Sequence, residues 1–139
     1  MNSPDIQLSR KLTNQLLHLA QLSPDLEVCG LIGGKNGLPT HCYPVKNTAE
    51  NPQQRFLLDA GEQISAMAKM REQGEELFAI YHSHPAAPAQ PSTTDLEMSA
   101  YPEALYLIIS LNTKGILEMR CFRINQKTAL EIPLTLSDE

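Results

Sequence analysis

Two histidines separated by one residue follow the short apolar run LFAIY. They are His82 and His84, and Pro85 comes directly after them. Successive side chains of a strand point to opposite faces, so His82 and His84 are expected to share one face with Phe78 and Ile80. Pro85 lacks the N–H group that a central strand needs, and the strand is predicted to stop there. The pattern therefore places two imidazoles together at the carboxyl end of a buried strand.

A carboxylate is expected to return to this pair from the next element. Residues 86–91 contain three alanines and two prolines, which is typical of a stiff extended segment. Ser92 and Asp95 then have the N-cap and third-residue spacing of a helix start. Taken singly, a histidine is more often structural and a Ser-x-x-Asp more often only a cap. Together, two imidazoles and one carboxylate are typical of a catalytic zinc site, so the sequence predicts Zn²⁺ bound by His82, His84 and Asp95.

Glu27 is an acidic residue inside the apolar run LEVCGLIGG, which predicts a buried strand over residues 26–34. An ionised carboxylate is costly there without a partner. One explanation is that Glu27 lies at the start of the strand and reaches water. The other is that this strand neighbours the histidine strand, which makes Glu27 a general base that later protonates the departing amine. Zinc favours such chemistry because it lowers the pKa of bound water to about 7.

Two further residues have alternative roles. Ser92 either caps the helix or donates its hydroxyl to the oxyanion of a tetrahedral intermediate, and the two tasks are compatible. Cys29 is either a third soft ligand or, as its position beside Gly30 favours, a small buried hydrophobe. The glycines of this run lack the G-x-G-x-x-G and G-x4-G-K spacings of phosphate-binding loops, so they indicate close backbone packing.

The elements that must position these residues form a mixed sheet flanked by helices, of class α/β or α+β. Strands are expected at residues 6–8, 26–34, 42–45, 55–58, 77–84, 104–111, 116–124 and 129–136, and a turn at 112–115. Helices are expected after the N-caps Ser9, Asp59 and Ser92, ending near residues 23, 74 and 100. Two of these helices have an apolar stripe that is expected to face the core. In the helix after Ser9 it consists of Leu12, Leu16, Leu19 and Ala20, and in the helix after Asp59 of Ile64, Met67 and Ala68. His18 and His41 lie outside these stripes and are expected at the surface.

Length and composition narrow the class of protein. The 139 residues fit one domain, residues 1–139, and 42% hydrophobic residues with only 5% aromatics indicate an aliphatic core. The net charge of −5 and the lack of a basic run argue against a nucleic-acid surface. Three cysteines without C-x-x-C spacing are typical of reduced thiols, and no segment has the length of a signal or membrane-spanning run. We therefore expect a soluble, cytoplasmic protein that binds neither nucleic acid nor membrane.

With these residues assembled, the sequence resembles the JAMM metalloproteases, the metal-binding branch of the MPN-domain family. The matching pattern is Glu27, then His82-Ser83-His84-Pro85, six residues, Ser92, two residues and Asp95. The stretches EVCGLIGG, RFLLDAGE and YPEALYLIIS are also similar to small bacterial members, so the resemblance extends over residues 6–124. It implies a cytidine-deaminase-like α/β/α fold, zinc on the two histidines and Asp95, Glu27 as acid and base, and Ser92 at the oxyanion.

The resemblance also implies a substrate class. JAMM proteases cleave peptide or isopeptide bonds after the C-terminal glycines of ubiquitin or ubiquitin-like proteins. Larger members carry an insertion after the aspartate that grips a ubiquitin chain, whereas eight residues separate Asp95 from the strand expected at Ala104. Small bacterial members are associated with ubiquitin-like sulfur-carrier proteins, from which they remove a C-terminal residue or extension. Such a carrier is therefore the expected partner, and the oligomeric state is left open.

Three other classes compete with this interpretation. A cytidine or adenosine deaminase needs H-x-E and P-C-x-x-C elements, and both are missing from the sequence. A metal-free MPN scaffold for protein–protein interaction is disfavoured because every expected zinc ligand is present. A deubiquitinase-like isopeptidase shares the chemistry and differs only in its substrate.

Overall fold

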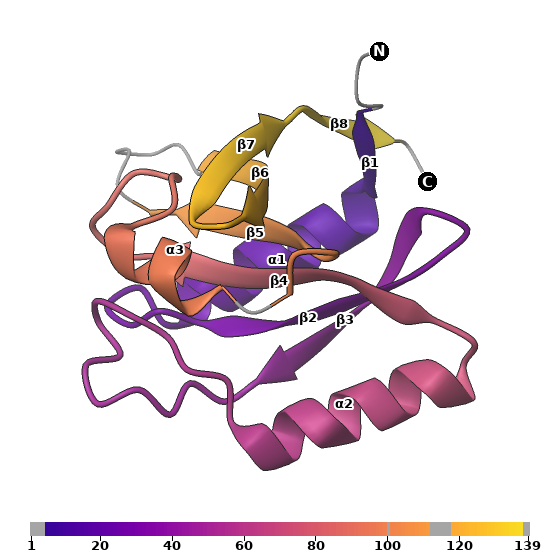
Figure 1. Ribbon diagram of the computed structural model, residues 1–139, viewed down its shortest axis with the longest axis horizontal. Helices are drawn as coiled ribbons and strands as arrows, with labels where there is room; N and C mark the ends of the chain where they lie inside the picture. The colour runs from indigo at the N-terminus through magenta and orange to yellow at the C-terminus, as the bar shows by residue number, and fades with distance from the viewer. Residues whose placement is uncertain (1–4, 100, 112–117, 138–139) are drawn as a thin grey trace.

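The computed structural model describes residues 5–99, 101–111 and 118–137. A mixed sheet of six strands, in the order β3-β2-β4-β5-β6-β7, forms its centre, and a small parallel pair, β1 and β8, lies beside it (Figure 1). The elements are β1 (Ile6–Ser9), α1 (Arg10–Leu22), β2 (Cys29–Lys35), β3 (Leu38–Val45), α2 (Ala60–Glu72), β4 (Glu76–His84), α3 (Thr93–Met98), β5 (Leu105–Ser110), β6 (Glu118–Asn125), β7 (Thr128–Ile132) and β8 (Leu134–Ser137). In the larger sheet β4 and β5 are parallel, and the other neighbours are antiparallel. The expected mixed α/β architecture is confirmed.

Helices cover both faces of this sheet (Figure 1). On one face α1 packs through Leu12, Leu16 and Ala20 in a cluster that includes Tyr81 of β4. On the other face α2 packs through Ala66 and Met70 against strand residues such as Ile80 and Ile108, and Leu96 of α3 joins them. The buried side chains are mainly aliphatic, as the low aromatic content predicts. The histidine strand β4 therefore lies between two layers of helix.

The helix starts agree with the sequence pattern. Ser9 Oγ accepts a hydrogen bond from Leu12 N at 3.1 Å, and Asp59 Oδ2 accepts one from Glu62 N at 2.9 Å. The carboxylate of Glu62 does not complete a capping box, because its Oε1 accepts a hydrogen bond from Lys46 N at 2.7 Å. The residue after α2, Gln73, is followed by a glycine with positive φ, a conformation that favours glycine at a helix end.

The side of β4 on which Phe78 lies differs from the prediction. The pairing of β4 with β2 shifts between the pairs Ile32–Ala79 and Gly33–Leu77, which leaves Phe78 without a partner on β2. An extra residue in one strand reverses the alternation of side chains. Phe78 consequently packs in the cluster on the α1 face, whereas Ile80 belongs to the opposite cluster. The prediction that Phe78 shares the face of the histidines is wrong for this reason.

Other expected elements have different bounds. The strand predicted at 55–58 is reduced to an isolated bridge between Asn47 and Leu58. Pro133 divides the strand predicted at 129–136 into β7, which pairs with β6, and β8, which pairs with β1. In α2, Ile64 is 68% exposed and not in the core, because the buried stripe is set by Ala66 and Met70. The turn predicted at 112–115 lies outside the described residues.

A buried carboxylate joins α2 to the edge strand β3. Glu75 accepts hydrogen bonds from the hydroxyls of Thr40 and Tyr43, and its Oε2 lies 2.5 Å from His41 Nδ1. Burial acts to raise the pKa of Glu75, but these contacts outweigh it and lower that pKa below its ordinary value. A Cβ atom at Gly33 would lie only 2.9 Å from Glu75 Oε1, so this carboxylate needs glycine beside it. His41 is exposed as expected, although it lies within β3.

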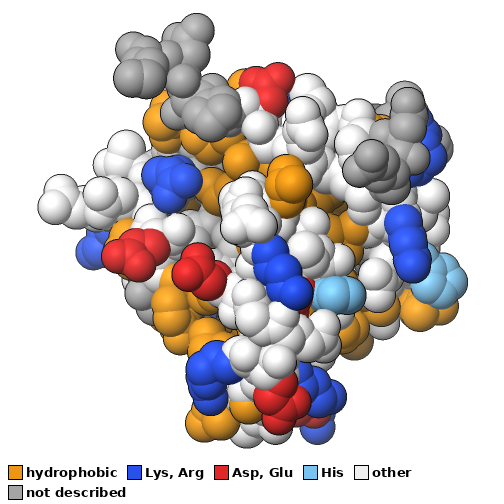
Figure 2. Space-filling view, turned by 90° about the vertical axis from the view of Figure 1, so that its right-hand side faces the viewer, with side chains coloured by type: hydrophobic (Ala, Val, Ile, Leu, Met, Phe, Trp, Pro, Cys, Tyr) orange, Lys and Arg blue, Asp and Glu red, His pale blue; other side chains and the backbone are white. Residues whose placement is uncertain are grey.

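Charged side chains of both signs are mixed on one face of the molecule. On the face shown in Figure 2, acidic and basic side chains are interspersed with apolar ones rather than gathered by sign. This differs from the clustered basic surface that nucleic-acid-binding proteins present. Within the described part of the chain, no helix has the length and apolar character needed to cross a membrane.

Candidate active site

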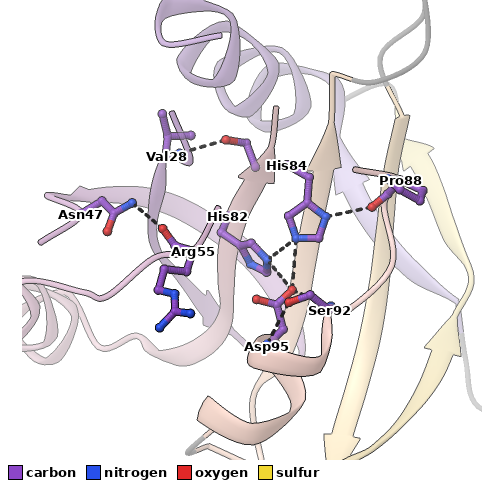
Figure 3. Close-up of polar contacts among 9 residues, drawn as sticks. Val28, Asn47, Arg55, His82, His84, Pro88, Ser92 and Asp95 are labelled. Atoms are coloured by element: carbon purple, nitrogen blue, oxygen red, sulfur yellow. Dashed lines mark hydrogen bonds and ion pairs between the residues drawn. The ribbon is translucent and has the colours of Figure 1, made fainter. Parts of the chain in front are cut away.

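Three side chains converge at the carboxyl end of β4. His82 Nε2 and His84 Nε2 lie 3.1 Å apart, and each lies 3.1 Å from Asp95 Oδ2. Figure 3 shows both imidazoles extending from β4 toward the aspartate on α3. All three side chains are buried. The structure thus brings together the three residues that the sequence predicts as zinc ligands.

This triangle has the dimensions of a tetrahedral metal site. Ligand bonds of 2.0–2.2 Å at tetrahedral angles place neighbouring ligand atoms about 3.3 Å apart, close to the observed spacing. His84 Nδ1 donates a hydrogen bond to Pro88 O at 2.8 Å, which leaves the lone pair of its Nε2 directed at the centre. Burial lowers the pKa of His82, and the neutral imidazole is the form that binds metals. The donor set therefore fits a zinc ion.

Asp95 is held in place by the start of its own helix. Ser92 N donates to Asp95 Oδ2 at 2.9 Å, and Asp95 N donates to Ser92 Oγ at 3.0 Å, which together form a complete capping box. Burial acts to raise the pKa of Asp95, but its contacts with His82 and His84 dominate and hold that pKa well below the usual range. The aspartate is therefore ionised, as a ligand must be. The predicted cap role of Ser92 is confirmed.

Glu27 lies beside the triangle rather than at the surface. A carboxylate oxygen of Glu27 and one ring nitrogen from each of His82 and His84 all lie within 4.8 Å of one another. Glu27 is 4% exposed, so the explanation that it reaches water is wrong. It also precedes β2, because the strand predicted at 26–34 begins only at Cys29. Glu27 is nevertheless placed as the second interpretation requires.

The surroundings of Glu27 suit proton transfer. Burial raises its pKa to about 7, although the nearby His84 acts to lower it and Asp95 adds to the rise. Its Oε1 has no hydrogen-bond partner within the part of the chain that the structure describes. A carboxyl group with a pKa near neutrality can accept a proton and return it at physiological pH. Glu27 therefore lies beside the triangle and has a pKa raised toward neutrality.

Backbone contacts hold Glu27 to the loop between β3 and α2. Glu27 N donates to Pro52 O at 2.7 Å, and Glu27 O accepts a hydrogen bond from Asn47 Nδ2 at 3.0 Å. The same Asn47 amide also donates to Arg55 O at 3.1 Å (Figure 3). Sequence reasoning missed Asn47, because a single asparagine in a polar loop carries no recognisable pattern.

A second residue missed by sequence reasoning supports His82. The ring of Phe56 stacks on the His82 imidazole, with ring centroids 4.4 Å apart and an interplanar angle of 23°. This contact covers one face of the imidazole and restricts its rotation. The segment RFLL gave no signal for this contact, because it is not part of a regular strand with a predictable face.

Cys29 does not belong to the triangle. Its Sγ donates a hydrogen bond to Val45 O at 3.4 Å, and burial raises its pKa to about 12. Among the described residues, the group of side chains placed to hold a metal ion comprises Glu27, His82 and His84, and Cys29 is not part of it. The interpretation of Cys29 as a small buried hydrophobe is therefore confirmed.

Comparison with known proteins agrees with this geometry. The family model for prokaryotic homologs of the JAB domain matches residues 9–125. The chain is 32% identical to the CysO-cysteine peptidase of Mycobacterium tuberculosis over 124 residues, covering 88% of this chain and 84% of that protein. It is 36% identical to the desampylase of Haloferax volcanii over 89 residues, covering 63% and 64% of the two chains.

A solved structure is similar along nearly the whole chain. It is the solution structure of protein DSY2949 from Desulfitobacterium hafniense, with a TM-score of 0.86 and 33% identity over 96% of this chain and 94% of that one. The family match includes Glu27, both histidines and Asp95 within its bounds. The resemblance drawn from the motif is thus confirmed, and the chain belongs to the prokaryotic branch of the JAB-domain, or JAMM/MPN, family.

Proposed function

We propose that this protein is a zinc-dependent peptidase that hydrolyses the amide bond after the C-terminal Gly-Gly of a ubiquitin-like sulfur-carrier protein. The observation that carries the proposal is the triangle of His82, His84 and Asp95 with the Glu27 carboxylate beside it. The relative from Mycobacterium tuberculosis is named as a peptidase acting on CysO-cysteine, which supports the substrate class. The three free cysteines favour a cytoplasmic location, where thiols remain reduced.

The ligands and the general base have separate tasks in this proposal. His82, His84 and Asp95 hold the zinc ion, and zinc, when bound, supplies Lewis-acid polarisation of a carbonyl and lowers the pKa of water. Glu27 takes a proton from the attacking water and returns it to the departing nitrogen. The oxygen of water first bonds to the carbonyl carbon and gives a tetrahedral intermediate. The C–N bond then breaks, so the products are the carrier with a C-terminal carboxyl group and a free amine. Glu27 is unchanged at the end of the cycle.

Ser92 is proposed to stabilise the oxyanion. Its Oγ accepts one hydrogen bond, from Asp95 N, so its own hydrogen remains able to donate to a developing negative charge. Ser92 is half-buried at the start of α3, next to the aspartate of the triangle. Cap and oxyanion donor are thus compatible tasks for one hydroxyl.

The connection after α3 favours a carrier over a ubiquitin chain. α3 ends at Met98 and β5 begins at Leu105, so no folded insertion follows the aspartate. Recognition must therefore rest on the extended tail and the folded body of a single carrier. The name of the Haloferax relative, a desampylase, makes an isopeptide-linked modifier the second candidate.

Mass spectrometry separates these candidates. The zinc-loaded protein is incubated with CysO extended by one residue beyond its C-terminus and, separately, with linked diubiquitin. We expect removal of the extra residue from CysO, no cleavage of diubiquitin, and no cleavage of either by Glu27→Gln. A free peptide with the sequence of the tail should be cut poorly, since it lacks the folded body. Efficient cleavage of diubiquitin beside intact CysO would contradict the proposal. The metal content of the protein as purified is a separate test, because a non-catalytic scaffold would contain no stoichiometric zinc.

A further inference from the structure

The two imidazoles of the triangle are held in different ways. His84 Nδ1 donates a hydrogen bond to Pro88 O at 2.8 Å. His82 Nδ1 is buried and has no hydrogen-bond partner among the residues that the structure describes. Metal-binding histidines almost always donate this second ring N–H to an acceptor, which fixes the orientation of the ring. The orientation of His82 therefore needs another support.

Phe56 supplies a contact that can fix this ring. Its own ring lies over the His82 imidazole, with centroids 4.4 Å apart and an interplanar angle of 23°. The torsion that turns a histidine ring has only a broad two-fold preference, so it does not hold the ring by itself. A nearly parallel ring at this distance opposes that rotation and keeps His82 Nε2 where it lies, 3.1 Å from both His84 Nε2 and Asp95 Oδ2. The stack thus does for His82 what the hydrogen bond to Pro88 does for His84.

The Asn47 side chain holds the backbone on both sides of Phe56. Its Nδ2 donates to Arg55 O at 3.1 Å, a contact drawn in Figure 3, and its Oδ1 accepts a hydrogen bond from Leu57 N at 2.9 Å. The same Nδ2 donates to Glu27 O at 3.0 Å. One amide group therefore places the Phe56 ring and joins it to the segment that carries the proposed general base.

We propose that Phe56 is a positioning residue for zinc binding, and that its ring, held by Asn47, fixes the His82 imidazole in the orientation that binds the metal. The inference rests on the zinc site of the proposed function and assigns a role there to residues outside the ligand set. A ligand whose orientation is fixed beforehand loses less conformational entropy on binding. The flat shape of the Phe56 ring, and not only its apolar bulk, should therefore determine the affinity for zinc.

Zinc affinity, measured by competition with a chromogenic chelator, tests this role without turnover. Phe56→Leu keeps an apolar side chain but has no flat ring. It should bind zinc about 10–100-fold more weakly, which is the usual effect of removing the support of a metal ligand. Phe56→Tyr keeps the ring and should bind zinc as tightly as the unmodified protein. The absorption spectrum of bound Co²⁺, which reports the arrangement of the ligands, should change in Phe56→Leu and not in Phe56→Tyr.

Leu58→Ala is the matched control. Leu58 belongs to the same loop and, like Phe56, is a partly buried side chain that packs against the apolar cluster on the α2 face. Its truncation should lower the Tm of the metal-free protein through lost packing, but should leave the zinc affinity and the Co²⁺ spectrum unchanged. An equal loss of zinc affinity in Leu58→Ala and Phe56→Leu would assign the effect to a loosened loop and overturn the inference.

A double variant tests the role of Asn47. Asn47→Ala should also weaken zinc binding, because it releases the backbone around Phe56. Two changes that act through one contact are not additive, so Phe56→Leu combined with Asn47→Ala should bind zinc about as tightly as Phe56→Leu alone. Fully additive losses would overturn the role assigned to Asn47.

The outcomes separate the inference from the proposed function. Tight, stoichiometric zinc binding by both the unmodified protein and Phe56→Leu leaves the proposed function standing and overturns the inference. Failure of the unmodified protein to bind zinc overturns both.

Discussion

Ser83 and Val28 are joined by two reciprocal hydrogen bonds. Ser83 N donates to Val28 O at 3.0 Å, and Val28 N donates to Ser83 Oγ at 2.9 Å. Ser83 lies between the two histidines, and Val28 directly follows Glu27. The pair therefore fixes the proposed general base relative to the proposed zinc ligands across two separate segments of the chain.

The first prediction follows from this pair. Ser83→Ala removes the acceptor for Val28 N and leaves a half-buried N–H group unpaired, which should cost about 1 kcal/mol of unfolding free energy. Because Glu27 then loses its fixed position, kcat should fall while zinc content stays stoichiometric. Urea unfolding, metal analysis and turnover measure the three quantities. Unchanged kcat in a destabilised variant would show that the pair is purely structural.

The second prediction concerns the metal. His82→Ala, His84→Ala and Asp95→Ala should each lose zinc on dialysis, because a three-ligand site has no spare protein ligand. His18→Ala, which changes an exposed histidine on α1, is the matched control and should keep it. Elemental analysis after dialysis gives the metal content. Full retention by any of the three variants would remove that residue from the ligand set.

The third prediction separates binding from chemistry. Glu27→Gln should keep its fold and its zinc, because the backbone of Glu27 makes the contacts to the loop. Its kcat should fall by roughly 10²–10⁴, since an amide cannot accept the proton of water. Single-turnover cleavage of an extended carrier measures the loss. Near-normal turnover would exclude Glu27 as the general base.

The fourth prediction divides the two tasks of Ser92. Ser92→Ala should lower kcat by roughly 10²–10³ through loss of one oxyanion donor, and lower stability by about 0.5–2 kcal/mol through loss of the cap. Ser92→Thr keeps both the hydroxyl and the cap, so it should restore both properties. Ser92→Asp keeps a capping oxygen without a hydroxyl donor, and should restore stability alone. A normal kcat in Ser92→Ala would show that Ser92 caps the helix and does not act as an oxyanion donor.

The fifth prediction concerns how stability depends on pH through Glu75, the buried carboxylate at the other end of β4. Because the folded pKa of Glu75 is below the unfolded value of 4.5, its ionised form stabilises the fold above pH 4.5, and this contribution is lost as pH falls through the folded pKa. Glu75→Gln should therefore be less stable than the unmodified protein at pH 7, by about 1.5–3 kcal/mol for a lost charged hydrogen bond.

Thermal unfolding between pH 7 and pH 3 tests this dependence. The difference between Glu75→Gln and the unmodified protein should shrink below pH 4.5. Glu76→Gln, which changes the exposed neighbouring residue, should show no such difference. A difference that stays constant over this pH range would assign the effect to packing rather than to charge.

The triangle of His82, His84 and Asp95 was predictable because local rules determine it. Strand alternation places His82 and His84 on one face, and the capping box returns Asp95 to them within thirteen residues of His82. Both rules operate over a few residues, so they can be applied without knowing the rest of the fold. The core face of α1 follows from the same kind of reasoning.

The features that sequence analysis missed depend on distant partners. The side on which Phe78 packs is set by the register shift between β4 and β2, and β2 lies more than forty residues earlier in the chain. His41 contacts Glu75 across thirty-four residues, and no local pattern joins them. The exposure of Ile64 likewise reflects how α2 lies on the sheet, which the apolar spacing of one helix does not determine.

The way Glu27 is attached to the protein has an evolutionary consequence. Its main-chain atoms bind the loop through Pro52 and Asn47, whereas its side-chain Oε1 has no hydrogen-bond partner within the described part of the chain. The main-chain atoms of Glu27 thus hold the local structure, and its carboxylate is left for the proposed proton transfer. A single nucleotide change that converts this codon to glutamine would remove the proposed proton acceptor and keep the main-chain contacts. Under the proposed role of Glu27, one substitution would convert a peptidase into an inactive protein with the same fold.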